Sequence, residues 1–424
     1  MDIDSTPTFL FQGIKIVEIG QYIAAPYAAE LFAHGGAEVV SIEPVDGGPT
    51  RHNDPLGPDS DGRQYVNKAR GKQSLPVNLS SPEGQKIVSE LVAKSDVVIS
   101  NLRPNLADTI GLSWETLSAQ NQGLIYAEVK GFGFEGPQSQ RACVDLVAQA
   151  SSGLTRSIGR FSDGRSAPSS VMIADFTAGA LLAFAIASAL YDRQSTGRGQ
   201  KVTTSLMSAC LLAQHRQASR FDRIDHWHQD LETKTAALGQ PDAQDLEEIC
   251  EWRHEQVGFA PYFYNIYRVA DGEIAVGAVA ANGPRLLEAA GINPDDLETP
   301  ATLKGMTVQE TVDLVAAHLS DHASDDLLET LLASGVPAAK VRFLEQALAD
   351  PSLKAAGVLH QFDHPRHGPT TIPAPPVRFS TSRYEPANDT PALGANTDTL
   401  LTQLGYDQHI IDRLVADGII ARAE

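Results

Sequence analysis

Short apolar runs alternate with amphipathic stretches through the first half of the chain. A β-branched run at residues 13–20 precedes a helix-compatible stretch at 26–34 and a second apolar run at 38–42. A strand, a helix and a strand within about 30 residues are typical of a right-handed parallel βαβ unit. The alternation continues, with predicted helices at 83–94, 114–120 and 145–152 and predicted strands at 96–100 and 124–130. This pattern predicts an open, doubly wound α/β sheet.

Capping and breaker residues mark the ends of several predicted elements. Ser81 and Pro82 have the chemistry of an N-cap and a first-turn proline. A long helix beginning near Asp175 is predicted to end at the TGRG tract, residues 196–199, before a strand at 201–205.

The second half of the chain has a different pattern. Polar and charged residues dominate between 216 and 261, and we place a domain boundary near Phe221. The Asp271-Gly272 pair predicts a hairpin within 262–279, which indicates an α+β domain. The proline-rich tract at 369–391 predicts an extended linker before a last helical segment at 398–417.

Charge and composition exclude several classes of protein. The chain of 424 residues has 53 acidic and 33 basic side chains, a net charge of -20, and 42% hydrophobic residues. Such a surface repels nucleic acid and anionic membranes. The longest apolar stretch, Ala178 to Leu190, has the length of a core helix rather than a membrane span. Residues 151–222 are the one net basic part, with eight basic and four acidic side chains.

Cysteine usage and the N-terminal sequence predict a cytoplasmic protein. The three cysteines are far apart and odd in number, which favours a reducing compartment over a disulfide framework. Met1 to Phe11 has two aspartates in place of a basic segment, and therefore has no credible secretory signal. The histidines have no spacing typical of a metal site, so we expect no bound metal.

One glycine motif suggests a nucleotide cofactor. Residues 131–136 read GFGFEG, a literal GxGxxG directly after a predicted strand. Pro137 follows at once, and no acidic residue closes a second strand about 20 positions later, as ribose recognition requires. A connecting loop is therefore favoured over NAD binding, although an NAD-dependent oxidoreductase stays an alternative.

Asp175 is the most informative single residue. It lies in the apolar sequence VMIADFTAG, immediately before a long apolar helix. An acid in this context is either a helix N-cap or a working carboxylate in a poorly hydrated pocket. The helix dipole would keep such a group ionised despite partial burial. The residue pattern alone favours the cap.

A series of ordered motifs resembles the class III CoA-transferase family, the group that includes carnitine and bile-acid CoA-transferases and an acyl-CoA racemase branch. The motifs are GIKIVEIG, AAPYAAELFAHGGAEVVSIEP, NKARGKQSLPVNLSSPEGQ, VISNLRPN, VKGFGFEGP, MIADFTAG and TGRGQKVTTSLMSA. Two further tracts, GVPAAKVRFLEQALADPSL and LGANTDTLLTQLGY, are similar to the family's C-terminal signatures. The resemblance covers nearly the whole chain and is weakest between residues 216 and 261.

The resemblance implies a fold, an assembly and a reaction. We expect a large Rossmann-like domain built from 1–220 and 331–424, a small α+β domain at 221–330, and an interlocked homodimer. Asp175 matches the family's catalytic aspartate, which forms an anhydride with a donor acyl group and then an aspartyl-CoA thioester. The implied substrates are an acyl-CoA and a carboxylic acid, with coenzyme A as substrate and no prosthetic group.

The resemblance also implies where coenzyme A binds. Pro44 and Thr109 replace residues that are basic in many members, so we expect the phosphates to depend on Arg51, Lys72 and Arg103. The complete set of expected CoA contacts is Ile23, Ala24, Arg51, Lys72, Val77, Asn78, Leu79, Ser80, Asn101, Leu102 and Arg103.

Two alternatives within the family stay open. The racemase branch has a histidine immediately before the aspartate that starts the helix after the glycine loop, and here that position is Val144, followed by Asp145. Valine carries no proton, so transfer is favoured over racemisation. Asp145 either shapes the acceptor pocket or caps its own helix. Pro44 and Thr109 also leave open a protein that binds CoA without turnover.

Overall fold

The structure is a computed structural model that describes residues 8–57, 60–103, 105–162, 165–221, 223–239, 241–257 and 261–423. It divides into two compact units. Unit 1 contains residues 1–160, 166–219 and 354–424, and unit 2 contains residues 161–165 and 220–353. The chain therefore leaves unit 1 and returns to it. The sequence places the start of this return at residue 331. In the structure, residues 331–353 still belong to unit 2, because β13 (Ala338–Lys340) pairs with a strand of that unit.

Unit 1 is built on a six-stranded sheet in the order β3-β2-β1-β4-β5-β8. Every neighbouring pair is parallel. This is the Rossmann strand order, with its switch point between β1 and β4. The strands are β1 (Lys15–Ile19), β2 (Glu38–Glu43), β3 (Gln73–Pro76), β4 (Val97–Ser100), β5 (Ile125–Lys130) and β8 (Lys201–Ser205). The prediction of a doubly wound α/β sheet is confirmed.

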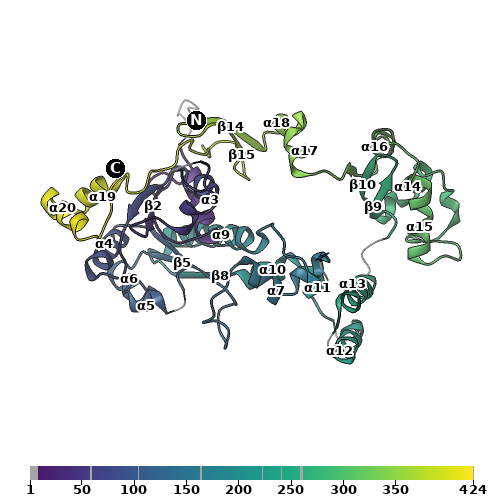
Figure 1. Ribbon diagram of the computed structural model, residues 1–424, viewed down its shortest axis with the longest axis horizontal. Coiled ribbons are helices and arrows are strands. Elements are labelled where there is room, and N and C mark those ends of the chain that lie inside the picture. The colour runs from purple at the N-terminus through teal and green to yellow at the C-terminus, as the bar shows by residue number, and fades with distance from the viewer. Residues whose placement is uncertain are drawn as a thin grey trace. The chain divides into compact units, whose positions relative to one another are not determined.

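Helices cover both faces of this sheet (Figure 1). Alternate strand residues enter two separate cores, as expected for strands that are buried on both sides. One core joins the sheet to α1 (Ala24–His34), α9 (Ile173–Thr196) and α10 (Leu206–Ala213). The other joins it to α4 (Pro82–Ala93) and to the C-terminal helices. Shorter helices complete the N-terminal part: α2 (Pro49–His52), α3 (Arg63–Lys68), α5 (Leu106–Thr109), α6 (Trp114–Gln120), α7 (Asp145–Ser151) and α8 (Leu154–Ile158).

The predicted helix ends have the expected chemistry. The Ser81 hydroxyl accepts a hydrogen bond from the amide of Gly84 at 3.2 Å, and Pro82 occupies the first turn of α4. Helix α9 ends at Gly197, whose φ of +66° is in the left-handed region that glycine adopts without strain.

Gly179 allows α9 to lie close against α1. A Cβ atom at this position would be 2.6 Å from the carbonyl oxygen of Ala24 and 3.0 Å from the Tyr27 ring. We therefore expect Gly179→Ala to lower the free energy of unfolding by about 1–3 kcal/mol, because the helices must separate, despite alanine's better helix propensity. Ala119→Leu, an enlargement at an exposed position of α6, should change it by less than about 0.5 kcal/mol. Urea unfolding measures both, and equal stability of the two variants would contradict the prediction.

Helix α9 is longer than the apolar stretch visible in the sequence. Its 24 residues make it the one described helix that is long and apolar enough to cross a membrane by length and composition. A core helix of a soluble protein passes the same test, and α9 contributes Ala174, Ala178, Leu182, Ile186 and Ala189 to the core beside the sheet.

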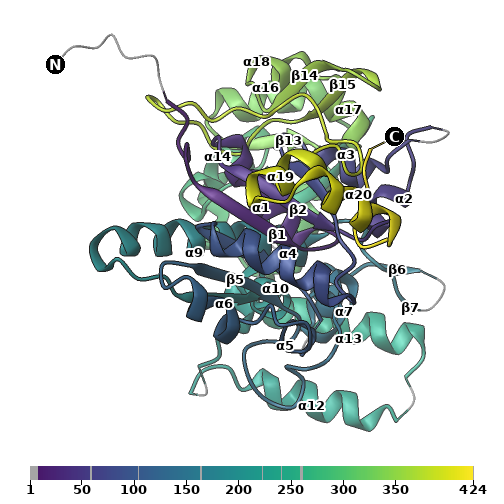
Figure 2. The same ribbon diagram turned by 90° about the vertical axis from the view of Figure 1, so that its left-hand side faces the viewer.

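The C-terminal segment packs against the first strands of unit 1. The hairpin β14 (Leu359–His364) and β15 (Gly368–Pro373) begins this return. After an irregular proline-rich stretch, α19 (Thr397–Leu404) and α20 (Gln408–Ala416) lie in front of β1 and β2 in Figure 2. The single helical segment predicted at 398–417 is thus two helices, because Gly405 ends α19 with a φ of +100°. Part of the predicted linker, Pro369–Pro373, belongs to β15.

Unit 2 has its own apolar core around an antiparallel sheet in the order β13-β10-β9. Strands β9 (Tyr264–Val269) and β10 (Gly272–Gly277) form the predicted hairpin around Asp271-Gly272. The helices of its core are α14 (Gly283–Ala289), α15 (Val308–Leu319) and α16 (Ser324–Ala333). Its remaining elements include α12 (Trp227–Ala237), α13 (Ala243–Val257), α17 (Leu344–Ala349) and the short pair β11 (Leu297–Thr299) and β12 (Thr302–Leu303).

Candidate active site

The β1–α1 turn and the loop after β4 are tied together at the switch point of the sheet. The Asn101 side chain accepts a hydrogen bond from the Gln21 amide at 2.9 Å and donates one to the Gln21 carbonyl at 2.7 Å. Tyr22 follows with a φ of +65°, a conformation that is uncommon for a residue other than glycine. Ligands of doubly wound folds bind in the crevice at such a switch point.

Asp175 is the third residue of α9 and does not cap it. The N-cap is Met172, which makes no side-chain hydrogen bond. The Asp175 amide instead donates to Asp145 Oδ2 at 2.9 Å, so the Asp145 carboxylate satisfies the first turn of α9. Asp145 is buried, and Gln149 donates to its other oxygen. The interpretations of both acids as caps of their own helices are therefore wrong: Asp145 caps α9 from outside, and this leaves the Asp175 carboxylate unused.

The surroundings of Asp175 leave its carboxylate half-buried and raise its pKa. Burial and the neighbouring Asp145 charge raise its pKa to about 6, against the opposing effect of Lys68. Among the described residues, no hydrogen-bond donor reaches its side-chain oxygens. A half-buried carboxylate that is ionised at neutral pH and weakly solvated is a competent nucleophile.

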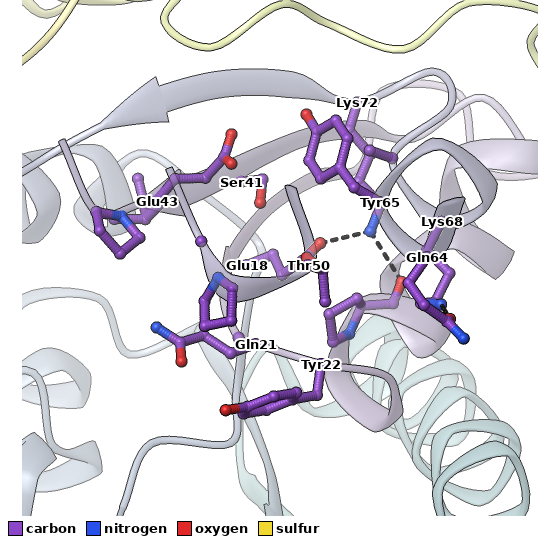
Figure 3. Close-up of a pocket in the computed structure, with 17 residues that line it drawn as sticks. Glu18, Gln21, Tyr22, Ser41, Glu43, Thr50, Gln64, Tyr65, Lys68 and Lys72 are labelled. Atoms are coloured by element: carbon purple, nitrogen blue, oxygen red, sulfur yellow. Dashed lines mark hydrogen bonds and ion pairs between the residues drawn. The ribbon is translucent and has the colours of Figure 1, made fainter. Parts of the chain in front are cut away.

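A pocket lies at the carboxyl ends of β1 and β2, and one of its lining residues, Lys68, interacts electrostatically with Asp175. The pocket is open to solvent, and its wall includes the β1–α1 turn, the ends of both strands, and helix α3. Figure 3 shows Lys68 and Gln64 at one side of the pocket and Glu43 across it. Lys68 also contacts the start of α9, since its Nζ lies 6.0 Å from the centre of the Phe176 ring. Lys68 thus connects the pocket with the turn that contains Asp175.

Two of the predicted phosphate ligands are already paired. Arg51 is buried and donates to Glu43 at 2.6 and 2.9 Å and to Asp61 at 2.8 Å. Lys72 is buried and donates to Glu18 at 2.6 Å, as the dashed line in Figure 3 marks. In this arrangement, neither side chain has an uncompensated charge to offer a phosphate. Their CoA contacts stay a prediction.

The other predicted CoA contacts lie at the same edge of the sheet, with different exposure. Arg103 is exposed directly after β4 and has no ion pair among the described residues. Ile23 and Ala24 start α1 with buried side chains, so a ligand there would meet their backbone or Tyr22. Val77 is buried, and a β-bridge joins it to Ile420. The remaining predicted contacts follow β3 and β4 and are partly or fully exposed: Asn78, Leu79, Ser80, Asn101 and Leu102.

The glycine motif at 131–136 lies at the wrong strand for a dinucleotide. It follows β5, whereas the phosphate-binding turn of a Rossmann fold follows β1. The next helix, α7, begins only at Asp145. The connecting-loop interpretation agrees with this arrangement. As for metals, no group of three or more His, Cys, Asp or Glu side chains within the described ranges is placed to hold an ion.

Sequence reasoning missed Lys68 and Tyr22. Lys68 lies in a polar tract where Arg70 and Lys72 are equally plausible, and only the fold brings it beside α9. Tyr22 gave no signal because its unusual conformation is imposed by the turn that Asn101 holds. The available hint was positional, since ligand sites of this fold lie at the loop after β1.

Comparison with known proteins identifies the family. A model of CoA-transferase family III matches residues 11–397. The chain is 27% identical to human succinyl-CoA:glutarate CoA-transferase over 97% of this chain and 90% of that protein. It is 28% identical to cinnamoyl-CoA:phenyllactate CoA-transferase of Clostridium sporogenes over 98% of this chain and 99% of that protein. A crystal structure of a point mutant of Rv3272 from Mycobacterium tuberculosis shares the fold, with a TM-score of 0.76 and 22% identity over 94% of this chain and 100% of that one. This chain is a CoA-transferase and belongs to CoA-transferase family III.

Proposed function

We propose that this enzyme transfers coenzyme A between carboxylic acids through covalent intermediates on Asp175. The observation that carries the proposal is the free, half-buried carboxylate in the first turn of α9, whose pKa of about 6 leaves it ionised at neutral pH. A side-chain carboxylate is chemically equivalent to the acids that are exchanged. It can therefore take the place of either one during the reaction.

The reaction balances without a redox step. An Asp175 oxygen attacks the thioester carbonyl, and CoA leaves as a thiolate from the resulting mixed anhydride. The thiolate attacks the aspartyl carbonyl, which releases the donor acid and forms an aspartyl-CoA thioester. The acceptor carboxylate then displaces CoA to form a second anhydride, and the thiolate attacks the acceptor carbonyl. This last step releases the new acyl-CoA and regenerates Asp175.

Trapping the intermediate tests this function directly. Incubation with a substrate acyl-CoA should add the mass of CoA less one water to the protein, and hydroxylamine should convert the adduct to a hydroxamate at Asp175. Turnover without any adduct at this residue would refute the mechanism.

Val144 supports transfer over racemisation. Inversion at an α-carbon requires two acid–base groups on opposite sides of the carbon. The residue before Asp145 is Val144, with 52% of its surface exposed, and it can neither give nor take a proton. The family's racemase activity stays a weaker alternative.

We also propose that the enzyme is a homodimer, as the family resemblance implies. Helix α9 supports this proposal, because Phe184 and Tyr191 are 73% and 78% exposed on a single chain. Light scattering at micromolar concentration should give twice the mass of the chain, and a monomer would contradict the proposal.

The Asp175 pKa predicts the acid limb of the pH profile. Because burial and Asp145 raise it to about 6, the nucleophile is protonated below that pH and ionised above it. We expect kcat/KM for acyl-CoA to rise about tenfold per pH unit below 6 and to level off above it. In Asp145→Asn the limb should shift to lower pH, because one neighbouring negative charge is lost. An unchanged limb in that variant would assign it to another group.

A further inference from the structure

Lys68 is an unusual cation for this part of the molecule. Arg51, Arg70 and Lys72, the other buried cations around it, each form an ion pair with a glutamate. Lys68 is 4% exposed, and its one hydrogen bond among the described residues goes to the neutral amide oxygen of Gln64. An ammonium has three N–H donors, so a buried lysine with a single neutral partner has spare capacity.

Lys68 is the charged residue of the pocket wall that forms no ion pair among the described residues. Glu18 and Glu43 also line the pocket, but Lys72 and Arg51 neutralise them. A ligand inside therefore meets two closed ion pairs and one ammonium. Burial, which disfavours the charged form, lowers the pKa of Lys68 to about 8, so the group is still mostly protonated at neutral pH.

The proposed reaction changes the balance at this ammonium. In the resting enzyme, the negative charge of Asp175 helps to hold Lys68 in its charged form. In the anhydride, Asp175 is acylated and no longer carries its negative charge, which has passed to the departing CoA thiolate. Of the acidic groups that favour the charged form of Lys68, Glu30 and Glu18 then remain, and each is already paired with another cation. A second anionic group on the substrate can replace the attraction that Asp175 no longer provides.

We propose that Lys68 binds a second carboxylate on the acyl chain, so that this enzyme acts on dicarboxylic acids and their CoA thioesters. The proposal rests on the function proposed for Asp175 and names the substrate class of the same site. The pocket beside Lys68 would hold the chain that carries this carboxylate. The CoA phosphates are a less suitable source of the anion, because the whole pantetheine arm separates them from the thioester that Asp175 attacks.

Matched pairs of donors test the proposal. Succinyl-, glutaryl- and adipyl-CoA are compared with butyryl-, valeryl- and hexanoyl-CoA, which have the same number of acyl carbons and no second carboxylate. We expect the wild-type enzyme to prefer the dicarboxylic member of the best pair by about thirtyfold or more in kcat/KM at pH 7, as for a buried charge-assisted hydrogen bond. Lys68→Met should reduce this ratio to about threefold or less, and Lys68→Arg should keep most of it.

The ratio separates the possible roles of Lys68. If Lys68 bound a CoA phosphate or acted only on Asp175, Lys68→Met would slow both members equally, and the proposal would be overturned. A wild-type enzyme without a dicarboxylic preference would also overturn it, even if the variant did not fold. The aspartyl-CoA adduct is measured in the same samples: adduct without discrimination refutes the role of Lys68, and discrimination without adduct refutes the role of Asp175.

The pH profile adds a second readout. Around Lys68, Glu30 on α1, Glu18 on β1 and Asp175 on α9 favour its charged form, and Lys72 opposes it. For the dicarboxylic donor, kcat/KM should fall as pH rises through about 8, where Lys68 loses its proton. This limb should be absent for the monocarboxylic donor. A limb shared by both donors would contradict the proposal.

Discussion

Asp175→Asn should lower kcat by at least about 10⁴-fold and abolish the CoA adduct, because an amide is a poor nucleophile and cannot form the anhydride. The substitution keeps the size and shape of the side chain. It leaves the backbone amide of residue 175 free to donate to Asp145, so the start of α9 is preserved. Initial rates with a substrate acyl-CoA and intact-protein mass spectrometry provide the two measurements.

Asp145→Asn is the matched control for this experiment. Both acids lie at the start of α9, but Asp145 is occupied by the Asp175 amide and by Gln149. An asparagine has one acceptor oxygen in place of two, so one of these contacts weakens. We expect a loss of about tenfold, with the adduct still formed, as for a positioning residue. The mechanism would be contradicted if Asp145→Asn lost the adduct and Asp175→Asn kept it.

Stability distinguishes a missing nucleophile from a damaged fold. The pKa of Asp175 is raised in the folded protein, so its ionisation costs folding free energy that builds up as the pH rises from 3.8 to about 6 and is fully present above that. Asp175→Asn removes that charge. We therefore expect the inactive variant to be at least as stable as the wild type at pH 7.5, as is common for functional sites. A lower Tm would assign the lost activity partly to structure.

The regular part of the fold could be predicted because local patterns and tertiary structure agree. The strands at 15–19, 38–43 and 97–100 are apolar runs bounded by turn signals, and burial on both faces of the sheet requires such runs. Strand β3 could not be found this way. Its sequence, QSLP, has no alternation and a proline, and it is a strand because β2 provides a parallel edge for it.

The site could be predicted in part, for a different physical reason. The chemistry of Asp175 is visible in the sequence, since an acid beside a long apolar helix requires an explanation. Charges in the NKARGKQ tract are not separable by sequence. The fold directs Arg70 to Glu30 and Lys72 to Glu18, and leaves Lys68 at the pocket. Contacts between residues up to 54 positions apart therefore decide which of these cations has no ion pair.

Lys72→Met should produce the largest loss of stability of these variants. Lys72 and Glu18 are 2% and 3% exposed, and the ammonium also donates to the carbonyl oxygen of Pro26 at 2.8 Å. Removal of the lysine leaves a buried glutamate without its partner, which typically costs about 3–5 kcal/mol. Urea unfolding at pH 7.5 measures this loss. The double variant Glu18→Gln with Lys72→Met should recover most of it, because no uncompensated charge is left.

The pH dependence of Lys72→Met identifies the cause of its instability. Burial already raises the pKa of Glu18 above its ordinary value despite the attraction of Lys72, and loss of the lysine raises it further. The deficit should therefore be largest where Glu18 must be ionised and should shrink as the pH falls and the carboxyl takes up a proton. If Lys72 instead serves coenzyme A, the variant will lose less than about 1 kcal/mol of stability, and its Kd for CoA will rise about tenfold or more at 50 mM salt. That result would return Lys72 to the phosphate-binding role that the sequence predicts.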